Sequence, residues 1–113
     1  MSLQPIPAAW RVAVCTALKS SRYRFTADAY RDWQNSFPGA FKSELIDDFV
    51  KVLSLSNLHG CPVPMDSPPG VTWEFWFTHQ GFKTYGKLLL STDAKNVVIF
   101  SAHHPRGPTL RCE

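Results

Sequence analysis

Lysine and tyrosine side chains recur at alternate positions in the C-terminal part of this 113-residue chain, and histidines follow them. Lys83, Tyr85 and Lys87 are spaced by two, so in a β-strand all three side chains would point to the same face. Trp76 and His104 lie on the runs that flank them. A surface that combines ammonium groups, aromatic rings and an imidazole is typical of proteins that bind single-stranded RNA.

The same residue types meet the requirements of RNA cleavage without a metal ion. Cleavage needs a group that deprotonates the ribose 2′-OH, cations that stabilise charge on the phosphate, and an acid for the leaving oxygen. Histidine titrates near neutral pH, so we expect His104 to act as the acid or base, with Lys83 and Lys87 as the other catalytic residues. The expected substrate-binding residues are Tyr85 and Trp76, whose rings would stack on unpaired bases, and the cation Arg106.

Each candidate also has a plainer interpretation. Lysine and tyrosine on an open strand are common on an ordinary solvated sheet face. Adjacent strand residues point to opposite faces, so His103 and His104 cannot easily bind one metal ion, and no acidic residue is near them in sequence. We therefore expect no metal site and no cofactor. The residues interpreted as part of the ordinary surface are His59, His79, Asp47 and Asp48.

Residues 71–104 predict the sheet that would position these side chains. Three aromatic and β-branched runs are joined by short turns, the first at Gln80 and Gly81. With the turn there, both faces of the first hairpin pair well, whereas a slip of one residue would disrupt both faces. The apolar face pairs Phe77 with Thr84, Phe75 with Gly86, Trp73 with Leu88 and Val71 with Leu90. The other face pairs Trp76 with Tyr85 and Glu74 with Lys87.

The third run of the sheet follows a turn over residues 92–95. Pairing Leu90 with Val97 and Leu88 with Ile99 continues the apolar face. On the other face, beside the two lysines and Tyr85, that register places Val98, Phe100, Ala102 and His104. Ser101 then lies on the covered side of the sheet and is interpreted as structural.

Helices are predicted before the sheet, and we expect them to cover its apolar face. The spacing of apolar residues indicates a helix over residues 7–20 and a second helix that begins after the N-cap residue Thr26. Residues 22–25 between them predict a short strand, and a third helix follows Pro38 and Gly39. Residues 56–70, rich in proline and glycine, predict a stiff loop. The expected fold class is α+β, with helices packed on one face of a small antiparallel meander sheet, in a single domain over residues 1–113.

Composition narrows the class of protein. The chain is 44% hydrophobic and 13% aromatic, which indicates a packed core rather than disorder. We expect no membrane association, because no apolar run reaches the roughly 18 residues that cross a bilayer and the N-terminus does not resemble a signal peptide. The net charge of +3 would assist approach to a polyanion.

The cysteines form no CxxC pair, so we predict no disulfide and no zinc site, and a reducing, cytoplasmic location.

The order of strand, two helices and three strands over residues 22–106 resembles that of the RelE-type ribonuclease toxins. The resemblance is carried by YRFTADAYRDW at residues 23–33 and YGKLLLSTDAKNVVIFSAHH at residues 85–104. It implies Lys83 and Lys87 as charge stabilisers, His104 as acid or base, and Arg106 as a phosphate contact. It also implies RNA as substrate and an antitoxin protein as partner. The helix over residues 7–20 is additional to that pattern, and lysine or tyrosine replaces a central-strand arginine.

The leading hypothesis is therefore a small metal-independent ribonuclease, and a candidate toxin of a toxin–antitoxin pair. The alternative is a non-catalytic module that binds a protein or single-stranded nucleic acid through the exposed rings of Trp76, Tyr85 and Phe100. A structural or regulatory subunit is the third hypothesis. A salt titration separates a nucleic-acid partner from a protein partner. Affinity for nucleic acid falls steeply with ionic strength, whereas affinity through an aromatic protein contact responds weakly.

Overall fold

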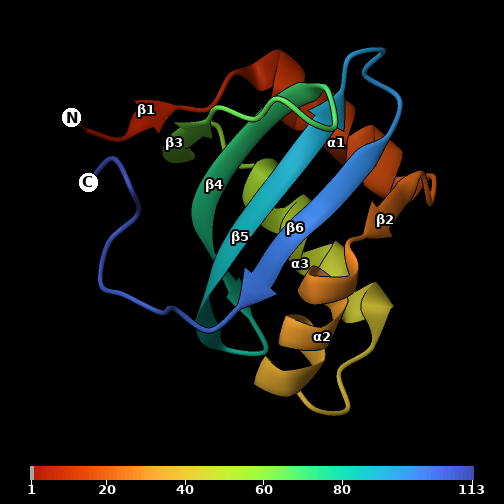
Figure 1. Ribbon diagram of the computed structural model, residues 1–113, viewed down its shortest axis with the longest axis vertical. Coiled ribbons are helices and arrows are strands. Elements are labelled where there is room, and N and C mark those ends of the chain that lie inside the picture. The colour runs from red at the N-terminus through yellow and green to blue at the C-terminus, as the bar shows by residue number, and fades with distance from the viewer. Residues whose placement is uncertain (1) are drawn as a thin grey trace.

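A computed structural model describes residues 2–113 and confirms the α+β class. The helices are α1 (Ala8–Lys19), α2 (Ala27–Ser36) and α3 (Lys42–Leu53) (Figure 1). The strands are β1 (Gln4–Pro5), β2 (Tyr23–Phe25), β3 (His59–Val63), β4 (Gly70–His79), β5 (Phe82–Ser91) and β6 (Val97–His103). The predicted N-cap is present, since the Ala29 amide donates to Thr26 Oγ1 at 3.0 Å. None of the helices in residues 2–113 is long and apolar enough to cross a bilayer.

The strands form one sheet in the order β1-β3-β4-β5-β6-β2. Its centre is the predicted meander β4-β5-β6, but the prediction of a purely antiparallel meander is wrong, because β2 adds to β6 in parallel and β3 and β1 extend the other edge. β3 lies inside the segment predicted to be a loop. Its Pro62 is compatible with a strand because β1 pairs only with His59 and Gly60, which leaves the rest of that edge unpaired.

The β4-β5 hairpin has the predicted register along its whole length. Gln80 and Gly81 form its turn with φ of 50° and 79°, and a two-residue turn of this hand requires positive φ at both positions. Gly86 faces the Phe77 ring, and a Cβ at that position would lie only 3.0 Å from a ring carbon. The absence of a side chain at Gly86 therefore makes room for an aromatic core residue.

A β-bulge in β6 disrupts the predicted alternation of that strand. Leu88 pairs with Ile99, as predicted, but the preceding residue Lys87 pairs with Ser101. Phe100 is left as an extra residue between the two pairs. Because side chains alternate between faces, one extra residue exchanges the faces of everything that follows it.

The residues after the bulge therefore lie on the faces opposite to those predicted. Ala102 is fully buried in the core, and the His104 ring lies 4.6 Å from the Phe37 ring, between centroids, at the end of α2. The prediction that these two residues join the lysines is wrong. Ser101 and His103 instead take the outer positions, beside Lys87 and Tyr85 respectively.

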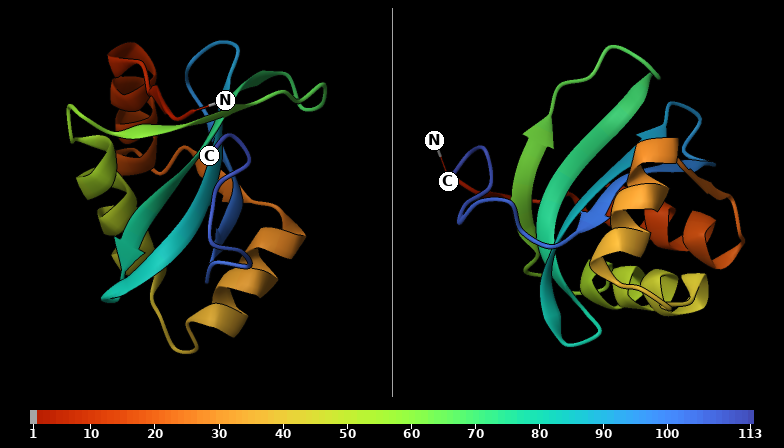
Figure 2. Two further views of the ribbon diagram at one scale, coloured as in Figure 1. Left: turned by 90° about the vertical axis from the view of Figure 1, so that its left-hand side faces the viewer. Right: turned by 60° about the horizontal axis from the view of Figure 1, so that its bottom comes forward.

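The inner face of the sheet and the helices share one apolar cluster. Phe49 of α3 is fully buried at its centre, where its ring stacks on Phe77 at 4.4 Å and meets Phe75 edge-on at 6.2 Å. In the right-hand view of Figure 2 the helices lie on one side of the sheet and the C-terminal segment lies on the other. The outer face is thus covered by a short irregular segment rather than by a helix.

His79, interpreted from the sequence as a surface residue, is fully buried and joins the end of β4 to two helices. Its Nε2 accepts a hydrogen bond from Trp33 Nε1 at 3.1 Å. Its Nδ1 therefore carries the proton and donates to the Asp48 carboxylate at 2.7 Å. The interpretation of His79 as exposed is wrong, and Asp48 is a structural partner of the hairpin as well as a partly solvated carboxylate.

Candidate functional site

A pocket of about 330 Å³ opens on the outer face of the central strands, and we call it the outer-face pocket. Its floor comes from β4, β5 and β6 and consists of Glu74, Trp76, Tyr85, Lys87, Ser101 and His103. Its wall comes from the C-terminal segment and consists of Arg106, Gly107, Thr109 and Arg111. The lining holds one ammonium and two guanidinium groups against one carboxylate, and this excess of positive charge favours an anionic ligand.

The structure brings most, but not all, of the predicted site residues together. The predicted residues that line the outer-face pocket are Lys87, Tyr85, Trp76 and Arg106. Lys83 does not line it, because its ammonium lies over the Trp76 ring, 4.3 Å from the ring centre. His104 lies on the opposite face of the sheet, so its predicted place beside the lysines is wrong.

His103 occupies the position predicted for His104. Its ring lies 5.2 Å from the ring of Tyr85, between centroids, and the residue is only 6% exposed. Its Nδ1 is 2.8 Å from the carbonyl oxygen of His104, and since a carbonyl can only accept, Nδ1 carries the proton. Nε2 is then the ring atom that can accept another proton.

Burial is the main cause that lowers the pKa of His103 below its ordinary value of 6.5. The nearby positive charges of Arg106 and Lys87 act in the same direction, whereas the hydrogen bond to the His104 carbonyl and the Asp32 carboxylate oppose them. The imidazole is therefore mostly neutral at pH 7, which is the state that can act as a base.

Lys87 is half-buried beside this imidazole in the pocket. Burial lowers the pKa of its ammonium below the ordinary 10.5, and the positive charge of Arg111 lowers it further. Glu74 acts against both by favouring the charged form. A lowered pKa makes the ammonium group a stronger acid than an exposed lysine.

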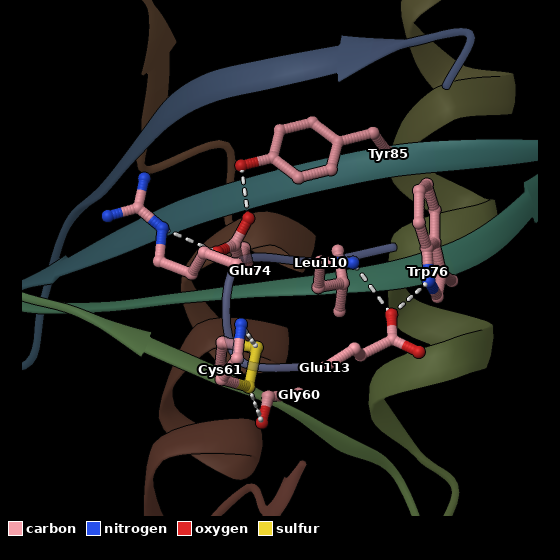
Figure 3. The surroundings of a disulfide bond; sticks show 9 residues. Gly60, Cys61, Glu74, Trp76, Tyr85, Leu110 and Glu113 are labelled. Carbon is pink, nitrogen blue, oxygen red and sulfur yellow. Dashed lines mark hydrogen bonds and ion pairs between the residues drawn. A yellow bond between two sulfur atoms is a disulfide. The ribbon is translucent and has the colours of Figure 1, made fainter. Parts of the chain in front are cut away.

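Glu74 is an almost fully buried carboxylate on the pocket floor, 2% exposed. Its Oε2 accepts the Tyr85 hydroxyl at 2.5 Å, and Oε1 lies 2.7 Å from Arg111 Nε (Figure 3). The Arg111 approach is a charge contact rather than a well-aligned hydrogen bond. Glu74 lies opposite Lys87 as predicted, but its close cation is Arg111.

Tyr85 has a supporting role in this geometry rather than that of a base. Burial raises the pKa of its phenol, and the hydrogen bond to Glu74 and the negative charge of that residue raise it further. The phenol therefore keeps its proton at neutral pH. Its ring forms a side of the pocket between Trp76, at 6.0 Å, and His103.

Cys61 of β3 and Cys112 of the C-terminal segment form a disulfide bond, so the prediction that no cysteines pair is wrong. Cys15 is a free thiol. Structural disulfides are rare in a reducing cytosol and persist in oxidising compartments, so the expected cytoplasmic location is not confirmed.

Six residues of the pocket lining are not among the site residues predicted from the sequence: Glu74, Ser101, His103, Gly107, Thr109 and Arg111. Ser101 was assigned to the wrong face, because nothing in the run VVIFSAHH marks Phe100 as the bulged position. Glu74 was identified only as a cross-strand partner. Arg111 lies beyond the last strand, and its one signal is the adjacent Cys112, whose disulfide partner cannot be identified from sequence alone.

Comparisons with protein families, with curated proteins and with solved structures find no match to this chain. The likeness to RelE-type toxins therefore stays an expectation drawn from the order of elements. Within residues 2–113, no three His, Cys, Asp or Glu side chains gather as a metal site would require. The function has to be argued from the outer-face pocket itself.

Proposed function

We propose that the protein is a metal-independent ribonuclease and that the outer-face pocket is its catalytic centre. One observation carries the proposal: an imidazole whose Nδ1 bonds a carbonyl, which leaves Nε2 to accept a proton, and a half-buried ammonium group line one pocket together with two arginines. These are the base, the acid and the charge-stabilising groups that cleavage of a phosphodiester requires.

His103 and Lys87 take the two proton-transfer roles. Nε2 of His103 accepts the proton of the ribose 2′-OH as the 2′-oxygen attacks phosphorus. The bond between phosphorus and the 5′-oxygen breaks, and the leaving oxygen takes a proton from the Lys87 ammonium. The products are a 2′,3′-cyclic phosphate and a 5′-hydroxyl, and a later proton exchange with water restores both side chains.

The remaining pocket residues bind and orient the substrate. The Arg106 side chain is two-thirds exposed and pairs with Asp32 at 3.0 Å, and its guanidinium would also bind a phosphate. Trp76 is half-buried in the pocket floor, and an unpaired base would stack on its ring beside the Lys83 ammonium, which lies 4.3 Å from the ring centre. A single strand fits this arrangement because its bases are free to leave their stacks.

Replacing Lys87 with alanine is expected to lower kcat/KM for RNA cleavage about 100-fold or more, because the phosphate loses its half-buried cation and the leaving oxygen loses its acid. Steady-state kinetics on a short RNA measure the effect. The matched control is Lys51→Ala, which removes the same charge from an exposed position on α3, on the helical side. Equal effects of the two substitutions would show that only net charge matters.

The pH profile of kcat/KM should be bell-shaped. Cleavage requires neutral His103, so activity falls as the pH drops through its pKa, which lies below 6.5 because of burial. Activity also falls at alkaline pH as Lys87 loses its proton, at a pH below 10.5. His103→Gln should remove the acidic limb. An acidic limb centred above pH 7 would contradict the assignment.

Binding without turnover is the second candidate function. Its supporting observation is the low exposure of His103, together with a carboxylate that already has Arg111 and Tyr85 as partners. Such a pocket could hold a phosphate group without cleaving it. Salt-dependent binding of RNA that stays intact after long incubation would favour this candidate. The toxin–antitoxin role and the antitoxin partner remain predictions from the resemblance.

A further inference from the structure

Residues 106–113 form a strap across the outer face of the sheet. Besides the Arg106–Asp32 ion pair and the buried side chain of Leu110, three contacts made by residues 111–113 hold it there. Its covalent attachment is the disulfide between Cys112 and Cys61. The second contact is the charge pair of Arg111 with Glu74. The third is Glu113, whose Oε1 accepts from Trp76 Nε1 at 3.1 Å (Figure 3).

The strap forms one wall of the outer-face pocket. Arg106, Thr109 and Arg111 all line the pocket from the strap side. The floor residues lie on β4, β5 and β6, whose backbone pairing does not involve the strap. Without the strap, therefore, the pocket would lose both its guanidinium groups and become an open sheet face.

We propose that the Cys61–Cys112 disulfide assembles the binding site by positioning Arg111, so that the protein binds RNA in its oxidised form and loses affinity when reduced. This inference rests on the proposed function, because it assumes that the outer-face pocket is where RNA binds. Arg111 is then a substrate-binding residue, and the disulfide is the element that positions it.

The disulfide can open without dissolving the main core. Cys61, Cys112 and Leu110 form a small cluster of their own on the outer face. The main core lies on the other face, between the sheet and the helices, and includes none of these residues. Loss of the covalent link therefore acts first on the strap, whose remaining contacts are the ion pairs of Arg106 and Arg111, the Glu113–Trp76 hydrogen bond and the packing of Leu110.

The chemistry of the switch is a simple two-electron exchange. A dithiol reductant supplies two electrons and two protons, which break the sulfur–sulfur bond and leave thiols on Cys61 and Cys112. The reductant is itself oxidised to a disulfide. A reducing cytosol would thus keep the strap untethered, and an oxidising compartment would lock it over the pocket.

Fluorescence anisotropy with a labelled RNA in which every 2′-OH is methylated tests the inference, since this probe cannot be cleaved. We expect the oxidised protein to bind the probe at least about tenfold more tightly than protein reduced with dithiothreitol, the loss typical of a charge-assisted contact. The double variant Cys61→Ser/Cys112→Ser should bind weakly in both conditions. Cys15→Ser, which removes the free thiol on α1, should keep the full redox response.

Arg111 variants separate a binding role from a purely structural one. With the disulfide intact, Arg111→Ala should weaken probe binding about tenfold, and Arg111→Lys should restore part of the affinity because it keeps the charge. Circular dichroism tests whether the sheet is unchanged in each variant. Amide exchange should show the strap released only where the Cys61–Cys112 disulfide is absent. These readouts also identify any variant that does not fold. If the double cysteine variant does not fold, chemically reduced wild-type protein takes its place in the comparison.

Equal affinity of the oxidised and reduced forms for the probe would overturn the inference, as would no binding in either form. Neither result decides the proposed function, which is judged separately by cleavage of the unmethylated RNA. A protein that binds the probe tightly only in its oxidised form but leaves unmethylated RNA intact would refute the ribonuclease proposal and support the redox-assembled site.

Discussion

His103→Ala is expected to lower kcat/KM for RNA cleavage by about 10²–10⁴-fold, the range typical of losing a general base. His104→Ala should change it by no more than about fivefold, in line with the roughly 1 kcal/mol of an exposed polar contact. The two residues are adjacent, but the bulge at Phe100 sends only His103 into the outer-face pocket. Steady-state kinetics on the same RNA substrate measure both.

The pair of histidine variants is its own control, because each removes one imidazole from the same strand end. Thermal unfolding of both should establish that they remain folded at the assay temperature. A larger loss for His104→Ala than for His103→Ala would contradict the placement of the bulge and restore the face predicted from simple alternation.

Phe49→Ala is expected to destabilise the protein by about 3–5 kcal/mol, because it removes a fully buried ring and leaves a cavity between α3 and the sheet. The lost contacts include the stacked ring of Phe77 and the edge-on ring of Phe75. Urea unfolding followed by circular dichroism gives the change in the free energy of unfolding.

Phe41→Ala is the matched control, since it removes the same ring from a position that is 71% exposed. Its cost should lie within about 0.5 kcal/mol, as for most surface substitutions. If Phe49→Ala does not fold, Phe49→Leu removes less volume and should still cost more than the Phe41 variant. Similar costs at the two positions would mean that Phe49 is not at the centre of the core.

The hairpin was predictable in detail because two independent patterns specify the same register. Trp73 and Phe75 require apolar partners on one face, while Trp76 finds Tyr85 on the other, and a slip by one residue would break both sets. Gln80 and Gly81 add a turn of the right length. The α+β class follows from the same alternation, together with helical spacing earlier in the chain.

The bulge was not predictable from alternation, and it decided which histidine enters the site. Val97, Val98 and Ile99 are apolar in sequence, so the pattern favours neither face and cannot mark an inserted residue. The β6 backbone takes the extra residue at Phe100 while Ala102, with its small side chain, enters the core. A regular strand without the bulge would place His104, and not His103, on the outer face.

The strap and its disulfide were missed for a different reason. Their contacts join residues far apart in the chain, as with Cys61 and Cys112, and no local pattern reports such pairs. β3 was not predictable for the same reason, because its proline-containing sequence forms a strand only with β4 beside it. Tertiary contacts, rather than local preference, set these parts of the fold.

Cleavage of a short RNA by the oxidised protein in the presence of EDTA is the most direct test of the central claim, that the outer-face pocket performs metal-independent RNA cleavage. We expect products that end in a 2′,3′-cyclic phosphate and a 5′-hydroxyl, and no cleavage of the DNA oligonucleotide of the same sequence, which lacks the attacking hydroxyl. Intact RNA, cleavage only after a divalent metal is added, or equal cleavage of the DNA would contradict it.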